Sequence, residues 1–378
     1  MIFAESLGIL LNAYDAKKMV NLRDLTQQEL ESFLASLGYP AYRGRQLYRW
    51  IFARRVSNFD EMTDLPQDLR MQLSHAAMIE IPRIADLSPE APDGTRKYLF
   101  ELRDGRYIET VFLPSSTGQT VCISTQVGCS LNCVFCATGR MGFYRNLTTA
   151  EIVNQVVEIE REEKTRISHV VFMGMGEPLC NFDAVMKAAH LFADPAGMGL
   201  SARHITISTI GIVPAIERII HERMPAKLAV SLHATNDEQR SQIIPVNKTY
   251  PLSLLMKTLR AYAHVTRYPI TFEYILIKDL NDRPEDAAAL PHLLRNIPAK
   301  LNLIRLHPTD CSFKPSPEER VEAFLKELRT AKLDATLRVS RGLECQAACG
   351  QLAPQEPRRN SPASDSVPTD MANLSDDI

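Results

Sequence analysis

Three closely spaced cysteines are the most chemically distinctive feature of this 378-residue chain. Cys129, Cys133 and Cys136 are separated by three and then two residues, which is a CxxxCxxC spacing. Cysteine thiolates hold iron–sulfur clusters, and a four-iron cluster with three protein thiolates keeps one iron open for another ligand. We therefore expect one [4Fe-4S] cluster per chain at this motif, with an open iron.

Two other interpretations of the motif stay open from the residues alone. A structural zinc site usually needs a second pair of ligands at finger-like spacing, and the sequence shows no such pair. Cys133 and Cys136 also have the CxxC spacing of a thiol redox site, which would leave Cys129 without a purpose. The cluster is favoured because it uses all three thiols.

Composition places the chain among globular enzymes, with 45% hydrophobic and 23% charged residues. No apolar run approaches the roughly 18 residues of a membrane span, and the first residues lack the basic region and cleavage site of a signal peptide. Eight cysteines, three of them clustered, favour a reducing compartment over a disulfide framework. We expect a cytoplasmic protein with no membrane partner, and a monomer, since no assembly pattern is visible.

Charge alone does not identify a polyanion partner, because the formal net charge is −2. Residues 351–378 carry five acids against two arginines, which leaves the remainder near +1. Residues 41–55 are locally basic, with five arginines, four aromatics and no acid. Such a segment can bind phosphates and stack on bases. It can equally be an amphipathic helix that buries Leu47, Trp50 and Ile51, and one helix can do both.

Four regions follow from the changes in pattern along the chain. Residues 1–21 form a leader without an assigned role, and residues 22–80 predict a small helical accessory domain, which is an RNA-binding domain if its basic segment, residues 41–55, contacts phosphates and bases. Residues 81–352 predict a barrel with a short antiparallel β extension. Residues 353–378 are rich in Pro, Ser and Asp and lack aromatics, which predicts a disordered tail.

The fold class follows from the alternation of strands and helices in the third region. An Asp104-Gly105 turn predicts a hairpin that forms the β extension. Beyond it, βα repeats with almost continuously apolar strands indicate parallel pairing covered by helices, and six repeats indicate an open (β/α)6 partial barrel. The six expected strands are 120–125, 169–173, 204–208, 227–232, 270–275 and 301–306.

Polar residues recur where these strands end, which is where barrel enzymes build their sites. Residues 174–178 read Gly-Met-Gly-Glu-Pro, and the flanking glycines allow a ligand to approach the backbone. Glu177 could bind an ammonium group. Ser208, Ser231, His233 and His307 end other strands, so we expect all of these groups at one rim.

The motifs together resemble the RlmN/Cfr family of radical SAM RNA methyltransferases, closest to its RlmN-type dual-specificity members. The resemblance runs in family order over roughly residues 22–352. Its most specific segments are 122–129, 135–139, 145–148, 174–178, 231–234, 244–247 and 347–352.

This resemblance implies radical methylation with two molecules of S-adenosylmethionine per turnover. Adenine C2 is not nucleophilic, so it cannot take a methyl group from a sulfonium in the ordinary polar way. In the family, one cofactor molecule methylates a cysteine that corresponds to Cys349, and the second yields the radical that activates this methyl group. Cys122 matches the thiol that helps to resolve the protein–RNA adduct, and Glu109 matches the proton acceptor. From the pattern alone, Glu109 would be a strand carboxylate facing solvent.

Cofactor contacts are implied in the same residue-by-residue way. The residues that match the family's S-adenosylmethionine contacts are Gly176, Glu177, Ser208, Ser231, Leu232 and His233. His307 stands where the family commonly has Asn, and its imidazole can still donate or accept a hydrogen bond.

The resemblance predicts methylation of adenosine C2 in 23S rRNA and in tRNA, with an electron donor such as flavodoxin or ferredoxin. A Cfr-type enzyme that methylates C8 of the same rRNA adenosine is the alternative. A protein of another class, an electron-transferring iron–sulfur protein that binds RNA, would need no cofactor pocket.

Overall fold

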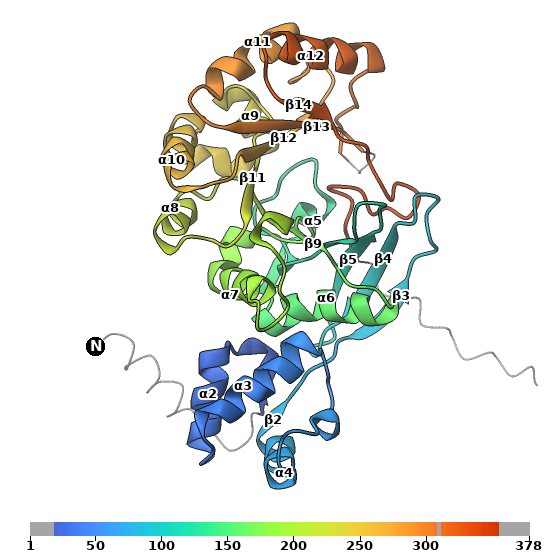
Figure 1. Ribbon diagram of the computed structural model, residues 1–378. Coiled ribbons are helices and arrows are strands. Elements are labelled where there is room, and N and C mark those ends of the chain that lie inside the picture. Colours follow the sequence, from blue (N-terminus) through green and yellow to red (C-terminus); the bar gives the residue numbers. More distant parts are fainter. Residues whose placement is uncertain (1–18, 308–310, 355–378) are drawn as a thin grey trace, which may run out of the picture.

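The computed structural model describes residues 19–307 and 311–354, and its centre is one ten-stranded sheet (Figure 1). Seven neighbouring strands in this part of the chain run parallel. In spatial order they are β6 (Thr120–Cys122), β9 (His169–Phe172), β10 (Ile205–Thr209), β11 (Lys227–Ser231), β12 (Ile270–Leu276), β13 (Ala299–Arg305) and β14 (Ala335–Leu337). The first six correspond to the predicted strands, and β14 adds a further one at the sheet edge.

Helices connect the parallel strands and lie along the outside of the sheet (Figure 1). They are α6 (Thr149–Glu162), α7 (Phe182–Ala193), α8 (Val213–Glu222), α9 (Asp237–Ile243), α10 (Leu252–Val265), α11 (Pro284–Leu293) and α12 (Glu318–Thr330). The sheet runs from β14 at one edge to β3 at the other without closing. The predicted α/β partial barrel is therefore confirmed.

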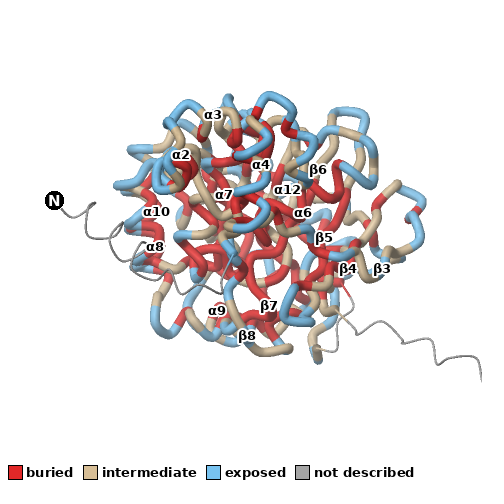
Figure 2. The backbone as a smooth tube through the Cα atoms, turned by 90° about the horizontal axis from the view of Figure 1, so that it is seen from below, coloured by how far each residue is buried: buried red, intermediate tan, exposed pale blue. Residues whose placement is uncertain are grey.

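Strand β12 illustrates how the sequence produces this layering. Phe272, Tyr274 and Leu276 are fully buried in the hydrophobic core, whereas the alternate side chains of Glu273 and Ile275 line a cavity inside the barrel. Successive side chains of a strand point to opposite faces, so one strand serves both the core and the cavity. The buried backbone is concentrated in the middle of the molecule (Figure 2).

The antiparallel extension continues the same sheet beyond β6. Strands β3 (Arg83–Leu87), β4 (Arg96–Glu101) and β5 (Tyr107–Leu113) pair antiparallel, and β5 also pairs antiparallel with β6. The turn between β4 and β5 contains Gly105 at φ +77°, a conformation that glycine adopts without steric cost. The Asp104-Gly105 hairpin predicted from the sequence is present.

The N-terminal helices pack below α6 (Figure 1). They are α2 (Gln27–Ser36), α3 (Ala41–Tyr48), a π-helical turn over Arg49–Ala53, and α4 (Gln67–Ala76), flanked by the parallel pair β1 (Val20–Asn21) and β2 (Ala77–Met78). Thr26 and Glu29 form a capping box at the start of α2. That these helices form a separate RNA-binding domain over residues 22–80 stays a prediction.

Two predicted segments fall largely outside the description. The structure does not describe residues 1–18 of the leader or residues 355–378 of the tail. Among the residues that it does describe, no helix is long and apolar enough to cross a membrane.

A buried arginine connects the N-terminal segment to the barrel. Arg23 is fully buried, its Nη1 donates to Asn154 Oδ1 at 2.5 Å, and Glu158 Oε1 lies 3.8 Å from the same nitrogen. Burial lowers the pKa of Arg23 to about 10 and raises that of Glu158, while the charges of Arg161 and Arg23 stabilise the Glu158 carboxylate. The contact therefore joins η1 (Leu22–Asp24) to α6 through a charged pair removed from water.

We expect Arg23→Met to lower the free energy of unfolding by about 3–5 kcal/mol, because the carboxylate of Glu158 loses its buried partner. Urea denaturation of the two proteins measures this difference. Arg161→Met is the matched control, since Arg161 pairs with the same carboxylate from a side chain that is 46% exposed. It should cost less than about 1 kcal/mol. Equal losses in the two variants would contradict the role given to the buried arginine.

Candidate active site

A cavity of about 240 Å³ lies inside the barrel, where the parallel strands end. The predicted site residues that line it are Cys122, Cys129, Cys133, Cys136, Gly176, Glu177, Ser208, Ser231, His233, His307 and Cys349. Two predicted residues, Glu109 and Leu232, are buried and do not line it. The structure thus brings residues from most of the barrel strands and from the C-terminal segment to one space.

A small antiparallel hairpin, formed by the strands before and after it, anchors the three-cysteine loop. The loop lies between β7 (Gln126–Gly128) and α5 (Ala137–Arg140), and β7 pairs antiparallel with β8 (Phe143–Asn146). The Cys129 N–H donates to the Gly142 carbonyl at 2.9 Å. Gly128 has φ +76°, and a Cβ there would collide with the same carbonyl oxygen, so glycine is required where the loop begins.

The surroundings of the three thiols favour their neutral form in the absence of a positive charge. Burial raises the pKa of Cys129 to about 12, raises that of Cys133 well above its usual value, and also raises that of Cys136. Only the thiolate is a metal ligand, and a bound metal supplies the charge that stabilises it. This donor set is therefore suited to a strongly cationic centre.

The chemistry of the donor set fits an iron–sulfur cluster. The three thiols line the same cavity. A multi-iron cluster takes thiolates on different irons, whereas tetrahedral zinc needs its ligands around one point. The residues present thus fit a [4Fe-4S] cluster.

Glu177 is placed beside this loop by tight backbone packing. Gly176 has φ +94°, and a Cβ on it would come within 2.5 Å of Gln126 Cβ. Gln126 Oε1 accepts the Glu177 N–H at 2.9 Å, while the two carboxylate oxygens accept the N–H groups of Leu179 and Ile210. Burial raises the pKa of Glu177 to about 7. The Thr209 hydroxyl donates to the same carboxylate, which keeps capacity for one further donor.

His233 faces the cavity as a neutral imidazole. Its Nδ1 accepts the Ile275 N–H at 3.1 Å, so the ring proton is on Nε2. Burial lowers the pKa of His233 to about 3, and the ring packs edge-on against Phe135 with centroids 4.9 Å apart. A residue at φ +59° is unusual, and Asn281 Nδ2 stabilises it by donating to the His233 carbonyl at 2.7 Å. The side chain can therefore donate one hydrogen bond to a ligand.

His307 also lines the cavity and is engaged by a neighbouring serine. Its Nε2 lies 2.7 Å from Ser340 Oγ, and burial lowers the pKa of the ring. A neutral imidazole can present one donor and one acceptor, as an Asn side chain does. The histidine found where the resembled family commonly has Asn thus keeps the hydrogen-bonding capacity of that position.

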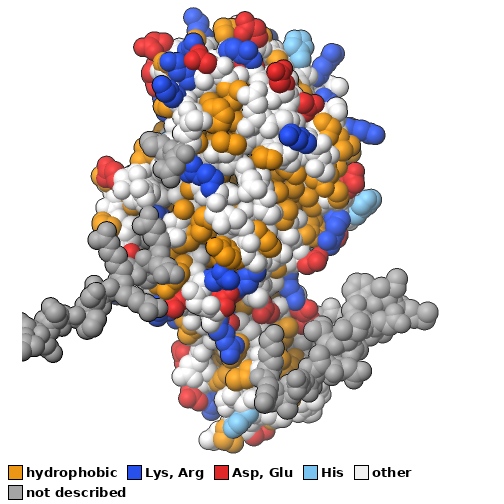
Figure 3. All heavy atoms as spheres, turned by 180° about the vertical axis from the view of Figure 1, so that it is seen from behind, with side chains coloured by type: hydrophobic (Ala, Val, Ile, Leu, Met, Phe, Trp, Pro, Cys, Tyr) orange, Lys and Arg blue, Asp and Glu red, His pale blue; other side chains and the backbone are white. Residues whose placement is uncertain are grey.

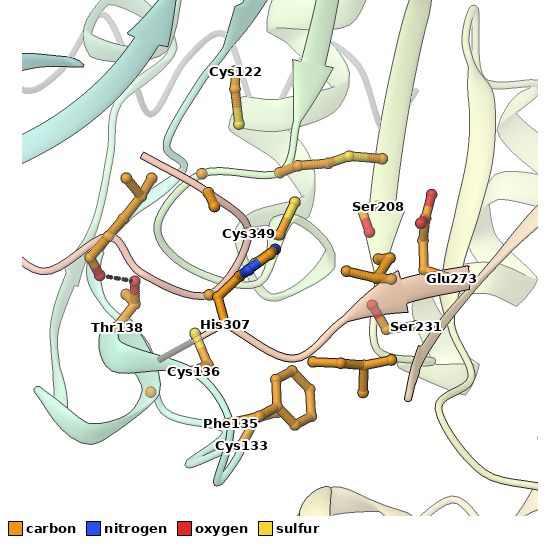
Figure 4. Close-up of a pocket in the computed structure, with 18 of the residues that line it drawn as sticks. Cys122, Cys133, Phe135, Cys136, Thr138, Ser208, Ser231, Glu273, His307 and Cys349 are labelled. Carbon is orange, nitrogen blue, oxygen red and sulfur yellow. Dashed lines mark hydrogen bonds between the residues drawn. The ribbon is translucent and has the colours of Figure 1, made fainter. Parts of the chain in front are cut away.

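The C-terminal segment is fixed against the cysteine loop by two hydrogen bonds that its backbone carbonyls accept. The Ala137 N–H donates to the Gly350 carbonyl at 2.7 Å, and Thr138 Oγ1 donates to the Leu352 carbonyl at 2.6 Å (Figure 4). Ala137 directly follows Cys136, and Gly350 directly follows Cys349. These contacts position the exposed thiol of Cys349 next to the motif that is far away in the sequence.

Cys122 and Cys349 direct their sulfur atoms toward one another across the cavity (Figure 4). Burial, and then the neighbouring charge of Cys349, raise the pKa of Cys122 to about 12. Arg338 lies in the same wall, and the charges of Cys349, Glu273 and Cys122 raise its pKa. The two thiols and a guanidinium therefore form one electrostatically coupled group.

Glu109 is buried on β5, which corrects the interpretation of it as a solvent-facing strand carboxylate. Its side chain is 5% exposed, and Oε1 pairs with Lys97 Nζ at 2.9 Å. Oε2 accepts the Ala353 N–H at 2.9 Å, so the carboxylate also holds the segment that carries Cys349. Burial raises the pKa of Glu109, and the charge of Lys97 opposes this.

Residues 41–53 of the basic segment fold as helix, and most of its aromatic side chains are not available for stacking. Tyr48, Trp50 and Phe52 are buried in the core, while Tyr42 is 45% exposed with Arg43 over its ring. On the face seen in Figure 3, basic and acidic side chains are interspersed. Any contact of this segment with RNA therefore depends on its exposed arginines and Tyr42.

Sequence reasoning missed three charged residues of the cavity, Glu273, Arg338 and Arg341. Glu273 interrupts an otherwise apolar strand, and a charged residue in a buried strand is a signal that could have revealed it. Arg338 follows β14, a strand too short to be recognised from its pattern. Arg338 reaches the cavity only because β14 pairs with β13 at the edge of the sheet, and this pairing cannot be recognised from the local sequence.

Comparison with known proteins places the chain among RNA-modifying enzymes. Residues 20–79 match the Ribosomal RNA large subunit methyltransferase N-terminal domain, and residues 123–290 match the Radical SAM superfamily. A dual-specificity RNA methyltransferase RlmN from Syntrophobacter fumaroxidans is 47% identical over 88% of this chain and 98% of its own length. A probable enzyme of the same name from Moorella thermoacetica is 46% identical over 88% and 97%, respectively.

A solved structure agrees with these sequence matches. The crystal structure of a radical SAM methyltransferase from Sphaerobacter thermophilus is 43% identical in sequence and aligns with a TM-score of 0.83. The alignment covers 88% of this chain and 99% of that one.

Proposed function

This chain belongs to the RlmN family of radical SAM RNA methyltransferases, and from that premise we propose that it methylates C2 of adenosine in 23S rRNA and in tRNA, with Cys349 as the methyl carrier. The observation that carries the proposal is the convergence of Cys349, Cys122 and the three-cysteine loop on one cavity. A methyl carrier has to reach the cofactor, and two hydrogen bonds from α5, one from the Ala137 N–H and one from the Thr138 hydroxyl, hold the segment of Cys349 against the cysteine loop.

The protein is an S-adenosylmethionine-dependent RNA methyltransferase with a [4Fe-4S] cluster, and two cofactor molecules serve each turnover. Cys129, Cys133 and Cys136 would hold the cluster. When bound, the cluster and S-adenosylmethionine supply the one-electron chemistry that activates a methyl group. Glu177 and His233 would orient the cofactor through one acceptor and one donor group. A small electron carrier such as flavodoxin or ferredoxin is the expected reductant.

Cys122 and Glu109 have complementary roles in this proposal. Cys122 faces Cys349, from where its thiol can help to release RNA that is covalently attached to the carrier. Glu109 serves as the proton acceptor, and its burial beside the Cys349 segment supports that role, because a raised carboxylate pKa makes a better base.

Nucleoside mass spectrometry tests the proposed reaction. After incubation of the reconstituted protein with unmodified 23S rRNA fragments and tRNA, we expect 2-methyladenosine in both. Formation of 8-methyladenosine would assign the enzyme to the Cfr-type alternative. Release of 5′-deoxyadenosine upon reduction separates both enzymes from a protein that only transfers electrons.

The ion pair of Glu109 predicts a pH effect with a defined sign. The charge of Lys97 lowers the pKa of Glu109 against the effect of burial, so Lys97→Met raises that pKa. A base works only when deprotonated, so the acidic limb of the pH–rate profile for methyl transfer should move to higher pH. Initial rates over a pH series measure this shift, and Lys97→Arg, which keeps the charge, should leave the limb in place. An unmoved limb in Lys97→Met would argue against Glu109 as the base.

The exposed arginines of residues 41–55 predict a change in RNA affinity. Arg49 and Arg54 are exposed, whereas Arg55 pairs with the buried carboxylate of Glu160. We expect the double variant Arg49→Gln/Arg54→Gln to bind RNA more weakly and to reduce the slope of log K against log salt by about 1–2. Fluorescence anisotropy with labelled RNA at several salt concentrations measures both effects. The control is Arg267→Gln, which replaces an exposed arginine before β12. If the slope of log K against log salt is equal in the wild type and in both variants, these arginines do not bind RNA and the segment has only a structural role.

A further inference from the structure

One buried carboxylate oxygen in the cavity has no hydrogen-bond partner among the described residues. Glu273 is 4% exposed, and its side chain lines the cavity from β12. Among the described residues, no group donates a hydrogen bond to its Oε2, whereas its Oε1 accepts from Asn302 Nδ2 at 3.0 Å. Leaving a buried acceptor unsatisfied costs free energy, so such an atom at a cavity wall indicates a ligand that supplies the donor.

A chain of hydrogen bonds fixes which oxygen faces the cavity. Thr336 Oγ1 donates to Asn302 Oδ1 at 3.0 Å, and this orients the Asn302 amide so that its Nδ2 points to Glu273. Glu273, Asn302 and Thr336 are register neighbours on β12, β13 and β14. Three adjacent strands thus hold the carboxylate through Oε1, and Oε2 is left without a hydrogen-bond donor among the described residues.

A hydrogen-bond donor lies beside the free acceptor. Arg338 Nη1 is 3.9 Å from Glu273 Oε2, and Arg338 lines the same cavity. Glu273 lies with Ser208 and Ser231 on the side of the cavity that faces Cys349 (Figure 4). The wall therefore presents an acceptor and a donor side by side, near the thiol that is proposed to carry the methyl group.

Adenine offers the complementary pattern. Its edge presents the N6 amino donor next to the N7 acceptor, whereas guanine presents two acceptors, O6 and N7, at the same places. An acceptor such as Glu273 Oε2 would accept from an adenine amino group and would repel O6 of guanine. Adenine occurs both in S-adenosylmethionine and in the target nucleoside, so the same chemistry has two sources.

We infer that Glu273 and Arg338 form an adenine-reading pair, in which Glu273 Oε2 accepts from the N6 amino group and Arg338 donates to a ring nitrogen. The inference rests on the proposed function, because it requires an adenine group to enter this cavity. The pair acts by binding and selection, and neither residue takes part in bond making.

Glu273→Gln is the sharpest test, because the hydrogen-bond chain determines how the new amide is oriented. Asn302 Nδ2 continues to donate to Oε1, so the amide nitrogen occupies the place of Oε2 and presents a donor where the acceptor was. Two quantities are measured on the reconstituted protein. These are the Kd of S-adenosylmethionine, and kcat/KM with RNA that carries adenosine, inosine or purine riboside at the target position.

The source of the adenine decides which quantity changes. If Glu273 reads the cofactor, the Kd of S-adenosylmethionine should rise about 10- to 100-fold and the preference among target bases should stay as in the wild type. If it reads the target base, the Kd should stay constant, and the preference for adenosine over inosine should fall by about the same factor. No change in either quantity would overturn the inference.

Controls separate this result from misfolding and from failure of the proposed function. Glu222→Gln makes the same chemical change at an exposed carboxylate that pairs with Arg218 on α8, and it should alter neither quantity. Iron content and circular dichroism report folding. If Glu273→Gln does not fold, Glu273→Asp keeps the charge and withdraws the acceptor, with the same outcomes expected. A wild-type protein that binds S-adenosylmethionine but methylates no RNA would refute the proposed function and leave the cofactor measurement valid.

Discussion

Cys349→Ala should abolish methyl transfer to RNA, by more than about 10⁴-fold, while the protein keeps its cluster. The loss is expected because the proposed carrier is the thiol itself, and no neighbouring group can replace it. The segment should stay in place, since the hydrogen bonds that hold it use the backbone of Gly350, Leu352 and Ala353 rather than the Cys349 side chain. The measurements are 2-methyladenosine formation by mass spectrometry and iron content per chain.

Cys345→Ala is the matched control for this prediction. Cys345 lies four residues before Cys349 on the same segment, and its Sγ donates to the Gly342 carbonyl at 3.4 Å. It does not line the cavity, so the variant should methylate RNA at close to the wild-type rate. Retained turnover in Cys349→Ala, or equal loss in both variants, would reject Cys349 as the carrier.

Cys133→Ala should lose both the cluster and all methyl transfer. Cys133 is 9% exposed and lies in the middle of the loop, so no other thiol of the motif can occupy its place. With two thiolates left, the cluster should be lost on purification, and iron content should fall to near background. The two cysteine variants therefore have distinct signatures, because Cys349→Ala is inactive with iron and Cys133→Ala is inactive without it.

Cys180→Ala provides the comparison for the cluster. Cys180 is an exposed cysteine that follows Glu177 closely in the sequence but does not line the cavity. Its replacement should leave iron content and activity unchanged. A Cys133→Ala protein that keeps its iron, or a wild type that carries zinc, would exclude the cluster assignment.

The sequence by itself determined the features that depend on near neighbours. The spacing of Cys129, Cys133 and Cys136 confines three thiols to one loop whatever the rest of the chain does. The capping box at Thr26, the turn at Gly105 and the apolar periods of the barrel strands are likewise set by residues a few positions apart. These patterns were sufficient to predict an α/β partial barrel with its polar residues at one rim.

Only the tertiary structure decided which residues are buried and which distant residues meet. Glu109 looked like a solvent-facing carboxylate, but Lys97 and the segment after Cys349 cover it. Glu273 and Arg338 became a pair only when β12 and the end of β14 came to one cavity. The physical reason is that chain connectivity limits the distance between near neighbours, whereas burial depends on contacts between remote segments, which a local pattern does not encode.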